Sequence, residues 1–496
     1  MQREYLILSF RTIGILVGVL ILFNSCKEEE IPFYNLYLDV NIEEAGTAEG
    51  AGEFTMGTEV SLKANPAEGY EFVWWSEGDS VLSEQSEFLF VMPGNDLVFT
   101  ANFQKTEYQL TVNIVPEDGG TVEGVGEYFQ GDPVTLVATS NSYYNFLYWT
   151  DFDGEVLTED AEYSFVMPLG DKVINAIFER PKFNVSIYAS PEVWGSVEGA
   201  GYHYWGDEVS INANAIDNVS FKHWTDKDNQ VVSTQETYQF IMPEDSVSFT
   251  AWFELNDGFV ADIDYNIYPI VTIGSQQWLG KNLMVSRYND GTPLPSELMG
   301  EQWQSTTEGA LKLYSHQNIS GLNSDEEVLQ AYGYHYNWYA AIDPAGLCPA
   351  GWSVPTIEQW QELINHLIDD HDMVNEESDG EEIGVGNALK SCRQTVSPLG
   401  APCQTSAHPR WETFTDDFPD ISMQVGLDIF GFAALPAGVI NFSGNGQDIG
   451  ESVGFWSTTP QDHQKAYFFS TVYVWNNMSQ ISNSKYMGLS VRCIKD

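Results

Sequence analysis

Three copies of one pattern fill the first half of the 496-residue sequence and constrain its fold more than any other feature. The string GTAEGAG from Gly46 returns as GTVEGVG from Gly120 and as GSVEGAG from Gly195. Each copy continues with an alternating strand, a Phe-x-x-Trp element, a strand ending in Met-Pro and a last alternating strand. Period-two alternation indicates half-buried strands, and self-similarity at a fixed spacing indicates tandem modules. We therefore expect three small all-β repeats, at residues 35–104, 107–180 and 182–255.

Three tryptophans share one position in the aligned copies. Trp75, Trp149 and Trp224 each close the Phe-x-x-Trp element. A residue that recurs in every copy is required by the shared fold, so we expect a core side chain here rather than a platform that stacks on sugars.

Two further tryptophans, Trp194 and Trp205, occur only in the third copy. The first copy has Ala45 and Met56 at these positions, and the second has Gly119 and Gln130. The shared fold does not need a large ring there. Local packing on a neighbour is the favoured interpretation, and an exposed ligand-binding patch is the competing hypothesis. The patch would consist of Trp194, Tyr202, Tyr204 and Trp205.

The five recurring landmarks resemble those of the divergent internalin-type B-repeat family of bacterial surface proteins. The resemblance covers about residues 35–254. It implies a series of β-rich modules that act as a spacer or adhesive stalk, and it implies no catalysis.

The N-terminus predicts export. Arg3 and Arg11 precede an apolar run from Ile13 to Phe23, which is typical of a signal peptide over residues 1–25. The run is shorter than the roughly 20 apolar residues that cross a bilayer. Cys26 resembles the lipobox cysteine of bacterial lipoproteins, which implies lipidation and anchoring in the outer membrane. An ordinary secretory signal with a chance cysteine is the alternative.

The residues after Cys26 form an acidic tether, residues 26–34. Lys27 followed by three glutamates resembles the sorting signal of Bacteroidetes-type surface lipoproteins, which implies display on the cell surface. The whole chain has 72 acidic and 20 basic residues and a formal charge of −52. Because nucleic-acid binding depends on Lys and Arg that neutralise phosphates, no nucleic-acid partner is expected.

A second pattern begins after the segment from Leu255 to Asp262. From Thr356, a candidate N-cap, apolar residues recur at helical spacing through Ile368, and short strands dominate downstream. These features predict an α+β module over residues 260–496. Tyr332, Tyr334, Tyr336 and Trp338 alternate, which favours a buried sheet face over a binding platform.

Long ordered motifs in this module resemble the Fibrobacter succinogenes major paralogous domain. They are DIDYN from Asp262, QWLGKNL from Gln277, LCPAGWSVPT from Leu347, FWSTT from Phe455 and SVRC from Ser490. The order of these motifs is similar to that of C-type-lectin-like and sulfatase-modifying-enzyme folds. The resemblance implies a C-type-lectin-like module that binds an extracellular glycan or protein. A surface enzyme with a reactive cysteine and a structural matrix component remain as alternatives.

Four cysteines follow Cys26, an even number that favours two disulfides in an exported protein. The C-type-lectin-like resemblance implies a long bridge between Cys348 and Cys493, which leaves Cys392 and Cys403 for a local one. Four free thiols in a metal or catalytic site are the competing arrangement.

The module lacks the sequence motifs of common hydrolases, metalloproteases and nucleotide-binding proteins. His366 and His371 are five residues apart on the expected helix, so we expect no shared zinc site. No cofactor and no metal are expected. We interpret the chain as a non-catalytic surface lipoprotein whose repeats form a stalk that displays a binding module.

Overall fold

The computed structural model describes residues 30–376, 383–391, 408–412 and 426–496. The predicted signal peptide with Cys26, and the predicted bridge between Cys392 and Cys403, lie outside these residues. The chain forms two compact units, Met1–Pro181 and Lys182–Asp496, and each is described by itself. Within the described part of the chain, no helix has the length and apolar character to cross a membrane.

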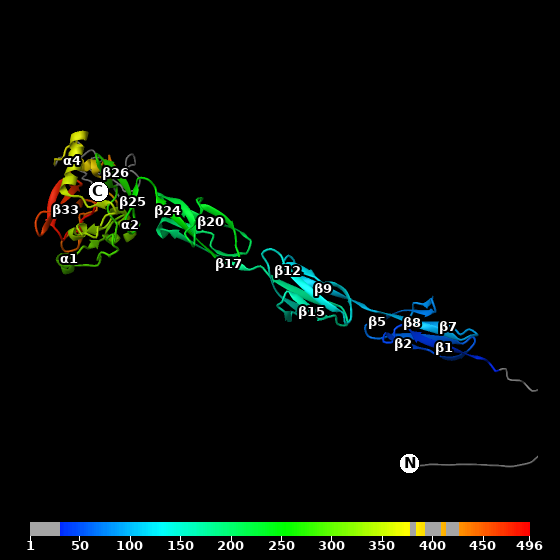
Figure 1. The fold of residues 1–496 in the computed structure, drawn as a ribbon. Helices are drawn as coiled ribbons and strands as arrows, with labels where there is room; N and C mark the ends of the chain where they lie inside the picture. Colours follow the sequence, from blue (N-terminus) through cyan, green and yellow to red (C-terminus); the bar gives the residue numbers. More distant parts are fainter. Residues whose placement is uncertain (1–29, 377–382, 392–407, 413–425) are drawn as a thin grey trace, which may run out of the picture. The chain divides into compact units, whose positions relative to one another are not determined.

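The first repeat consists of a five-stranded and a three-stranded sheet. Their strand orders are β3-β1-β8-β5-β6 and β2-β4-β7. The first and last strands, β1 and β8, pair in parallel, and the other neighbours are antiparallel. The strands, labelled in Figure 1 where space allows, are β1 (Phe33–Val40), β2 (Gly46–Glu49), β3 (Gly52–Thr55), β4 (Glu59–Pro66), β5 (Tyr70–Glu77), β6 (Ser80–Ser83), β7 (Glu87–Val91) and β8 (Leu97–Lys105).

The second repeat has the same topology, with sheets β11-β9-β16-β13-β14 and β10-β12-β15. Its strands are β9 (Glu107–Val115), β10 (Gly120–Glu123), β11 (Gly126–Phe129), β12 (Pro133–Ser140), β13 (Asn145–Asp151), β14 (Val156–Thr158), β15 (Glu162–Val166) and β16 (Lys172–Glu179).

The third repeat repeats this order as β19-β17-β24-β21-β22 and β18-β20-β23. One short 3-10 helix, η1 (Glu192–Trp194), is added after its first strand. The strands are β17 (Lys182–Ser190), β18 (Gly195–Glu198), β19 (Gly201–Tyr204), β20 (Glu208–Ala215), β21 (Val219–Asp226), β22 (Val231–Ser233), β23 (Thr237–Ile241) and β24 (Val247–Leu255). The prediction of three tandem all-β domains is confirmed.

The recurring sequence landmarks are core and turn residues. Trp75, Trp149 and Trp224 are fully buried, and their indole N–H groups donate to the carbonyls of Ser86, Asp160 and Glu236. Each repeat therefore closes its own core around the same hydrogen-bonded ring.

The backbone conformation explains why one glycine recurs in every repeat. Gly50, Gly124 and Gly199 all have φ near +100° (112°, 94° and 104°). A Cβ at these positions would lie 2.5, 2.2 and 2.4 Å from the carbonyl oxygen of the neighbouring strand. Only glycine fits this turn without strain.

The C-terminal region contains helices and short strands, as an α+β module requires. Its main sheet, β25-β26-β27-β36-β30, adds the last strand of the chain to the first hairpin of the region. The strands are β25 (Phe259–Ala261), β26 (Ile267–Ile273), β27 (Gln276–Leu279), β28 (Leu311–Lys312), β29 (His335–Tyr336), β30 (Trp352–Ser353), β31 (Val439–Ile440), β32 (Gly446–Gln447), β33 (Ser452–Pro460), β34 (Lys465–Val472), β35 (Ser479–Ser484) and β36 (Ile494–Lys495).

The helices of this region are short except one. They are α1 (Glu301–Ser305), η2 (His316–Asn318), α2 (Asp325–Tyr332), α3 (Trp338–Ala341), α4 (Ile357–His371) and α5 (Val385–Leu389). The long helix α4 begins after Thr356, as predicted, with a reciprocal capping box between Thr356 and Gln359. Its Trp360 is fully buried among Phe432, Phe455 and Phe469.

The alternating aromatic run does not form one strand. Tyr332 ends α2, Tyr336 lies in β29 and Trp338 begins α3, and all three are buried. The expected burial is correct for these three, and Tyr334 is half-buried. The expected sheet face is wrong because the chain turns at Gly333 and again at Asn337.

Candidate functional site

The structure places Trp194 in a joint between the third repeat and the C-terminal region. Its side chain is 9% exposed and belongs to the core of the repeat. The indole ring meets the Tyr265 ring edge to face at 5.7 Å, and its N–H donates to the Tyr265 carbonyl at 3.1 Å. Ala261 and Ile267 pack against the same core. The hypothesis of an exposed ligand-binding Trp194 is therefore wrong, and the favoured interpretation, packing on a neighbour, is what the structure shows.

The aligned positions of the other repeats show that Trp194 replaces a small residue at a position with shared backbone hydrogen bonding. The carbonyls of Ala45, Gly119 and Trp194 accept equivalent hydrogen bonds from Ala67, Asn141 and Ile216. The same backbone hydrogen bond thus recurs in all three repeats, and only the third carries a ring at this position.

The other three residues of the expected patch lie at the opposite end of the repeat. Tyr204 pairs with Lys182 at the start of β17, whereas Trp194 follows the end of that strand at Ser190. Eight strand residues at about 3.3 Å each separate the two ends by about 26 Å. Tyr202 and Tyr204 are exposed, and Trp205 is half-buried in the next turn. Trp194 and these residues do not form one patch.

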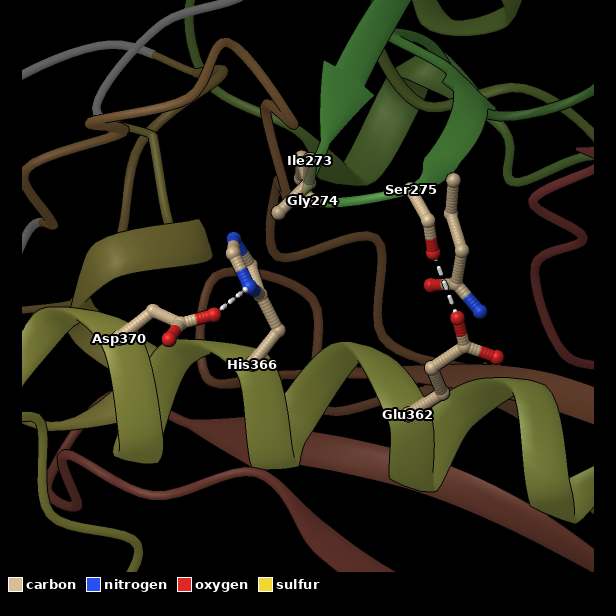
Figure 2. A pocket seen from close by; sticks show the side chains of 7 residues that line it. Ile273, Gly274, Ser275, Glu362, His366 and Asp370 are labelled. Atoms are coloured by element: carbon tan, nitrogen blue, oxygen red, sulfur yellow. Dashed lines mark hydrogen bonds and ion pairs between the residues drawn. The ribbon is translucent and has the colours of Figure 1, made fainter.

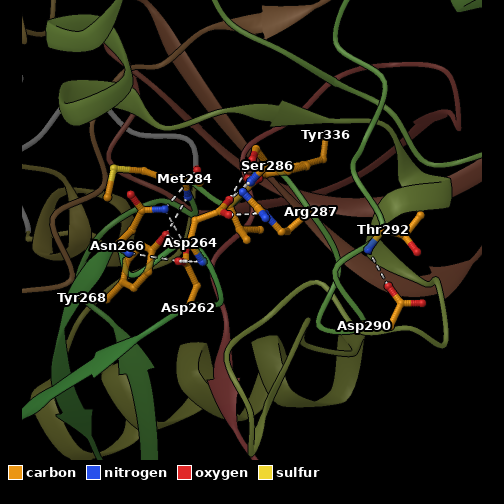
Figure 3. A network of polar contacts seen from close by, with 11 residues as sticks. Asp262, Asp264, Asn266, Tyr268, Met284, Ser286, Arg287, Asp290, Thr292 and Tyr336 are labelled. Carbon is orange, nitrogen blue, oxygen red and sulfur yellow. Dashed lines mark hydrogen bonds and ion pairs between the residues drawn. The ribbon is translucent and has the colours of Figure 1, made fainter. Parts of the chain in front are cut away.

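The loop that receives Trp194 is held by a buried aspartate (Figure 3). Asp262 accepts hydrogen bonds from the backbone of Asp264 and Asn266, from the Asn266 amide at 2.9 Å and from the Tyr268 hydroxyl at 2.6 Å. Burial raises the pKa of Asp262, and these hydrogen bonds oppose the rise. The loop holds Tyr265 at φ 65°, a left-handed conformation that is rare for a tyrosine.

A second carboxylate ties this loop to the following segment. Asp264 accepts from the backbone N–H and hydroxyl of Ser286 and forms an ion pair with Arg287 at 2.5 Å. Because N–H and O–H donors already surround both carboxylates, the Asp-x-Asp-x-Asn sequence is a structural turn here rather than a calcium loop. Sequence reasoning missed Tyr265, although its place in this turn motif was a usable signal.

A disulfide joins Cys348 to Cys493, with Cα atoms 6.0 Å apart and a sequence separation of 145. It links the segment before β30 to the end of the chain. Beside it lies an open groove of about 400 Å³. Its walls include Trp338, Ile342, Asp343, Trp352 and Thr458, a mixture of apolar, hydroxyl and carboxylate groups that suits a binding cleft.

A second hollow, of about 480 Å³, lies between α4 and the turn after β26 (Figure 2). Ser275 donates to Glu362 at 2.7 Å, and His366 pairs with Asp370 at 2.6 Å. The serine and the histidine thus belong to separate pairs, so this arrangement is not a nucleophile activated by a histidine base.

The two histidines of α4, five residues apart in sequence, lie close together in the structure. The rings of His366 and His371 lie 5.1 Å apart, which corrects the expectation that they face apart. Within the described ranges, no group of three or more His, Cys, Asp or Glu side chains could hold a metal ion.

Buried charges in this region are structural. Arg492 is fully buried and donates to the carbonyls of Leu279 and Ala433 and to the Asn282 side chain. Burial lowers its pKa to about 9, partly opposed by Asp428. Lys390 is buried over the Trp411 ring and donates to the Trp475 carbonyl at 2.6 Å, and burial lowers its pKa to about 7.

Two protein families match the chain. The family described as the divergent InlB B-repeat domain matches residues 36–107, 110–182 and 185–257. The family described as the Fibrobacter succinogenes major domain matches residues 271–495. No curated protein matches the chain.

Solved structures are similar only at a low level. The Bacillus anthracis TIE protein aligns at 10% identity over 45% of this chain, with a TM-score of 0.25. The aligned chain spans 51% of that protein, about half its length. A 3Ig structure of titin domains aligns at 6% identity over 44% of this chain and 96% of that one, with a TM-score of 0.10. At these identities and TM-scores, the alignments indicate neither the fold nor the function of this chain.

The recurring cores and the turn glycines fall within the repeats that the first family matches, and the helices and short strands fall within the region that the second family matches. The chain consists of three divergent InlB B-repeat domains followed by a Fibrobacter succinogenes major domain.

Proposed function

We propose that the chain is a non-catalytic surface protein in which the three repeats act as a spacer that displays the C-terminal domain. The Trp194–Tyr265 joint is the observation that carries this proposal. A spacer that presents a module needs a defined attachment, and the last repeat alone has a large ring at this position. The fixed loop around Asp262 gives that ring a preformed partner.

A spacer acts through its length, which gives a direct test in cells. Deleting residues 107–180 should reduce the access of an antibody against the C-terminal domain on intact cells. Replacing the second repeat with a copy of the first is the matched control and should leave access unchanged. Unchanged access after the deletion would contradict the spacer role.

We propose that Cys26 is lipidated and anchors the protein in the outer membrane, with the acidic residues behind it directing the chain to the cell surface. Each buried acyl CH2 contributes about 0.8 kcal/mol, so two or more chains hold a protein firmly. Surface labelling of intact cells should be lost for Cys26→Ser and retained for Ser25→Ala. Equal labelling of both variants would refute the anchor.

We propose that the groove beside the disulfide binds an extracellular glycan or protein, within a C-type-lectin-like domain. Ile342 is an exposed apolar residue in its wall. In a pull-down with the complete chain, Ile342→Asp should lose the captured ligand. Ile481→Asp, on β35 and equally exposed, is the control and should keep it. Loss in both variants would point away from the groove.

The enzyme alternative needs a reactive cysteine, as in sulfatase-modifying relatives. Cys348 and Cys493 are joined to each other and present no thiol. A thiol would have to come from Cys392 or Cys403, and titration of thiols in the exported protein is the experiment that favours or removes this alternative.

A further inference from the structure

The outer face of the five-stranded sheet in the third repeat carries a row of aromatic side chains. Strand register places Tyr204 beside Lys182, Tyr202 beside Asn184, Tyr188 beside Thr250, and Trp252 beside both Ser190 and His223. Even-numbered residues of β17 and β24 point away from the core, because Val185, Phe249, Ala251 and Phe253 between them are buried. All four aromatic rings therefore stand on one face.

These rings are accessible. Tyr202 is 73% exposed, Tyr188 58%, Tyr204 41% and Trp252 37%. From Lys182 to Ser190 the row follows eight strand residues, a length of about 26 Å. Isolated exposed apolar residues need no explanation, but four exposed aromatic rings along one sheet face indicate an interaction surface.

The orientation of the largest ring is fixed. The Trp252 indole N–H donates to the Thr225 hydroxyl at 3.0 Å, and the His223 ring lies 6.4 Å away at an angle of 40°. At the other end, the Lys182 ammonium lies 4.4 Å from the centre of the Tyr204 ring. A ring that is already immobilised loses little conformational entropy when a ligand stacks on it.

The first two repeats differ at the same positions of the same face. Where the third repeat has Tyr202, the others have Glu53 and Glu127, and where it has Lys182, the second has Glu107. Where it has Tyr188, the others have Asp39 and Asn113. Trp252 takes the place of Asn102 and Ile177.

The replacements remove carboxylates and add rings. The next acidic side chain along β24, Glu254, is ion-paired with Lys222 at 3.0 Å. Between the rings stand the amide of Asn184 and the hydroxyl groups of Ser186, Ser248 and Thr250. In a chain of formal charge −52, this face offers a ligand rings and neutral donors at positions where the first repeat has carboxylates.

We propose that the aromatic row of Tyr188, Tyr202, Tyr204 and Trp252 binds a neutral polysaccharide chain. The C–H faces of sugar rings stack on the electron-rich faces of aromatic rings, and hydroxyl and amide side chains match sugar hydroxyls. An anionic polymer would meet Lys182, while Lys222 is already paired with Glu254, and it would be repelled by the acidic rest of the chain. This site is separate from the groove of the C-terminal domain and makes the third repeat a contact as well as a spacer.

Affinity gel electrophoresis of the complete chain without residues 1–26 tests the proposal. The gels contain, in turn, mannan, galactomannan, xyloglucan, mixed-linkage β-glucan and starch as neutral probes, and alginate as the anionic probe. We expect retardation by at least one neutral polysaccharide and none by alginate. For that polysaccharide, the Tyr188→Ala, Trp252→Ala double variant should bind at least tenfold more weakly.

Matched variants separate binding from folding. Tyr37→Ala changes an exposed tyrosine on the same sheet face of the first repeat and should leave retardation unchanged. Tyr202→Ala, on an edge strand, should weaken binding several-fold with an unchanged melting temperature, so the proposal stays testable if the double variant is unstable. Ile342→Asp tests the groove of the C-terminal domain separately. Retardation that Ile342→Asp abolishes and Tyr202→Ala leaves unchanged would place the polysaccharide in that groove and overturn the proposal.

Three further results would overturn the proposal. They are the absence of retardation by every neutral polysaccharide, an equal loss on Tyr37→Ala, and stronger retardation by alginate than by the neutral probes. Self-association that depends on Tyr188 and Trp252, without retardation, would instead make this face a protein contact.

Discussion

The first and third repeats share a core and differ at their surfaces. Both bury a tryptophan that donates to a strand carbonyl, and both use the same strand order. At the position after the first strand, however, the first repeat has the small Ala45 and the third has Trp194, which reaches the C-terminal domain. The fold of a repeat thus depends on few positions, and the remaining positions can acquire a joint or a contact face without changing the core.

The largest expected effect comes from destabilising the C-terminal domain, which is the neighbour of the third repeat. The first two repeats should be unaffected. In the chain-entropy model, a bridge across 145 residues stabilises the C-terminal domain by about 5 kcal/mol. The Cys348→Ala, Cys493→Ala variant should lose that amount in the C-terminal domain, read by hydrogen exchange. Amides of the first two repeats should keep their protection, and a loss there would contradict the modular account.

The control for this variant is Cys392→Ala, Cys403→Ala, the pair that we predict to be bridged locally. A short loop is worth about 3 kcal/mol in the same model, and its effect should stay near the bridge. An equal loss from both double variants would mean that loop length does not determine the effect.

The second prediction concerns what the repeats have in common. Because Trp75, Trp149 and Trp224 are fully buried, truncation of any one to alanine should destabilise its own repeat by about 3 to 5 kcal/mol. Chemical denaturation followed by hydrogen exchange in each repeat would measure this. A loss below about 1 kcal/mol at Trp224 alone would show that the third repeat depends on its neighbour more than on its core.

The third prediction uses pH to separate the two halves of the chain. Burial lowers the pKa of His335 to about 4 from 6.5, so the folded domain keeps it neutral while the unfolded chain takes up a proton below about pH 6.5. The free energy of unfolding of the C-terminal domain should therefore fall by about 3 kcal/mol from this residue as the pH drops from 6.5 to 4. The first two repeats contain no histidine and should show no such loss.

Asp428 acts in the opposite direction, since burial raises its pKa to about 6 and the folded state takes up that proton first. The His335→Gln variant isolates the histidine, because glutamine keeps a donor toward the Ala437 carbonyl. Denaturation at pH 4.5 and pH 7 should show a weaker pH dependence in this variant than in the wild type. The same dependence in both proteins would exclude His335 as its source.

The repeats could be predicted from the sequence because each recurring residue is required by the backbone or core of its own repeat. The glycine at Gly50 is required by a positive φ, and Trp75 by a core that recurs. Helix α4 was readable from Thr356 and from apolar spacing for the same reason. Such local patterns can be recognised without knowing which elements pack against them.

The Trp194–Tyr265 joint and the aromatic row of the third repeat could not be predicted from the sequence in the same way. The repeat comparison showed that Trp194 is not needed by the fold, but both an exposed ring and a ring packed on a neighbour satisfy that observation. Trp252 and Tyr188 carry the same signal, and only strand register places them on one face with Tyr202. A sequence comparison identifies positions that differ, whereas pairing and burial decide what the differences do.

Trp194 should couple the stability of the third repeat to that of the C-terminal domain. Burial of such a ring contributes about 2 kcal/mol, a smaller effect than the loss of the long disulfide or of a core tryptophan. A double-mutant cycle measures the coupling through amide exchange in β20 and β24, with the wild type, Trp194→Ala, the Cys348→Ala, Cys493→Ala variant and their combination. We expect loss of the disulfide to lower protection of the third repeat by about 2 kcal/mol with Trp194 present and by less than about 0.5 kcal/mol without it. An equal change in both backgrounds would contradict this coupling.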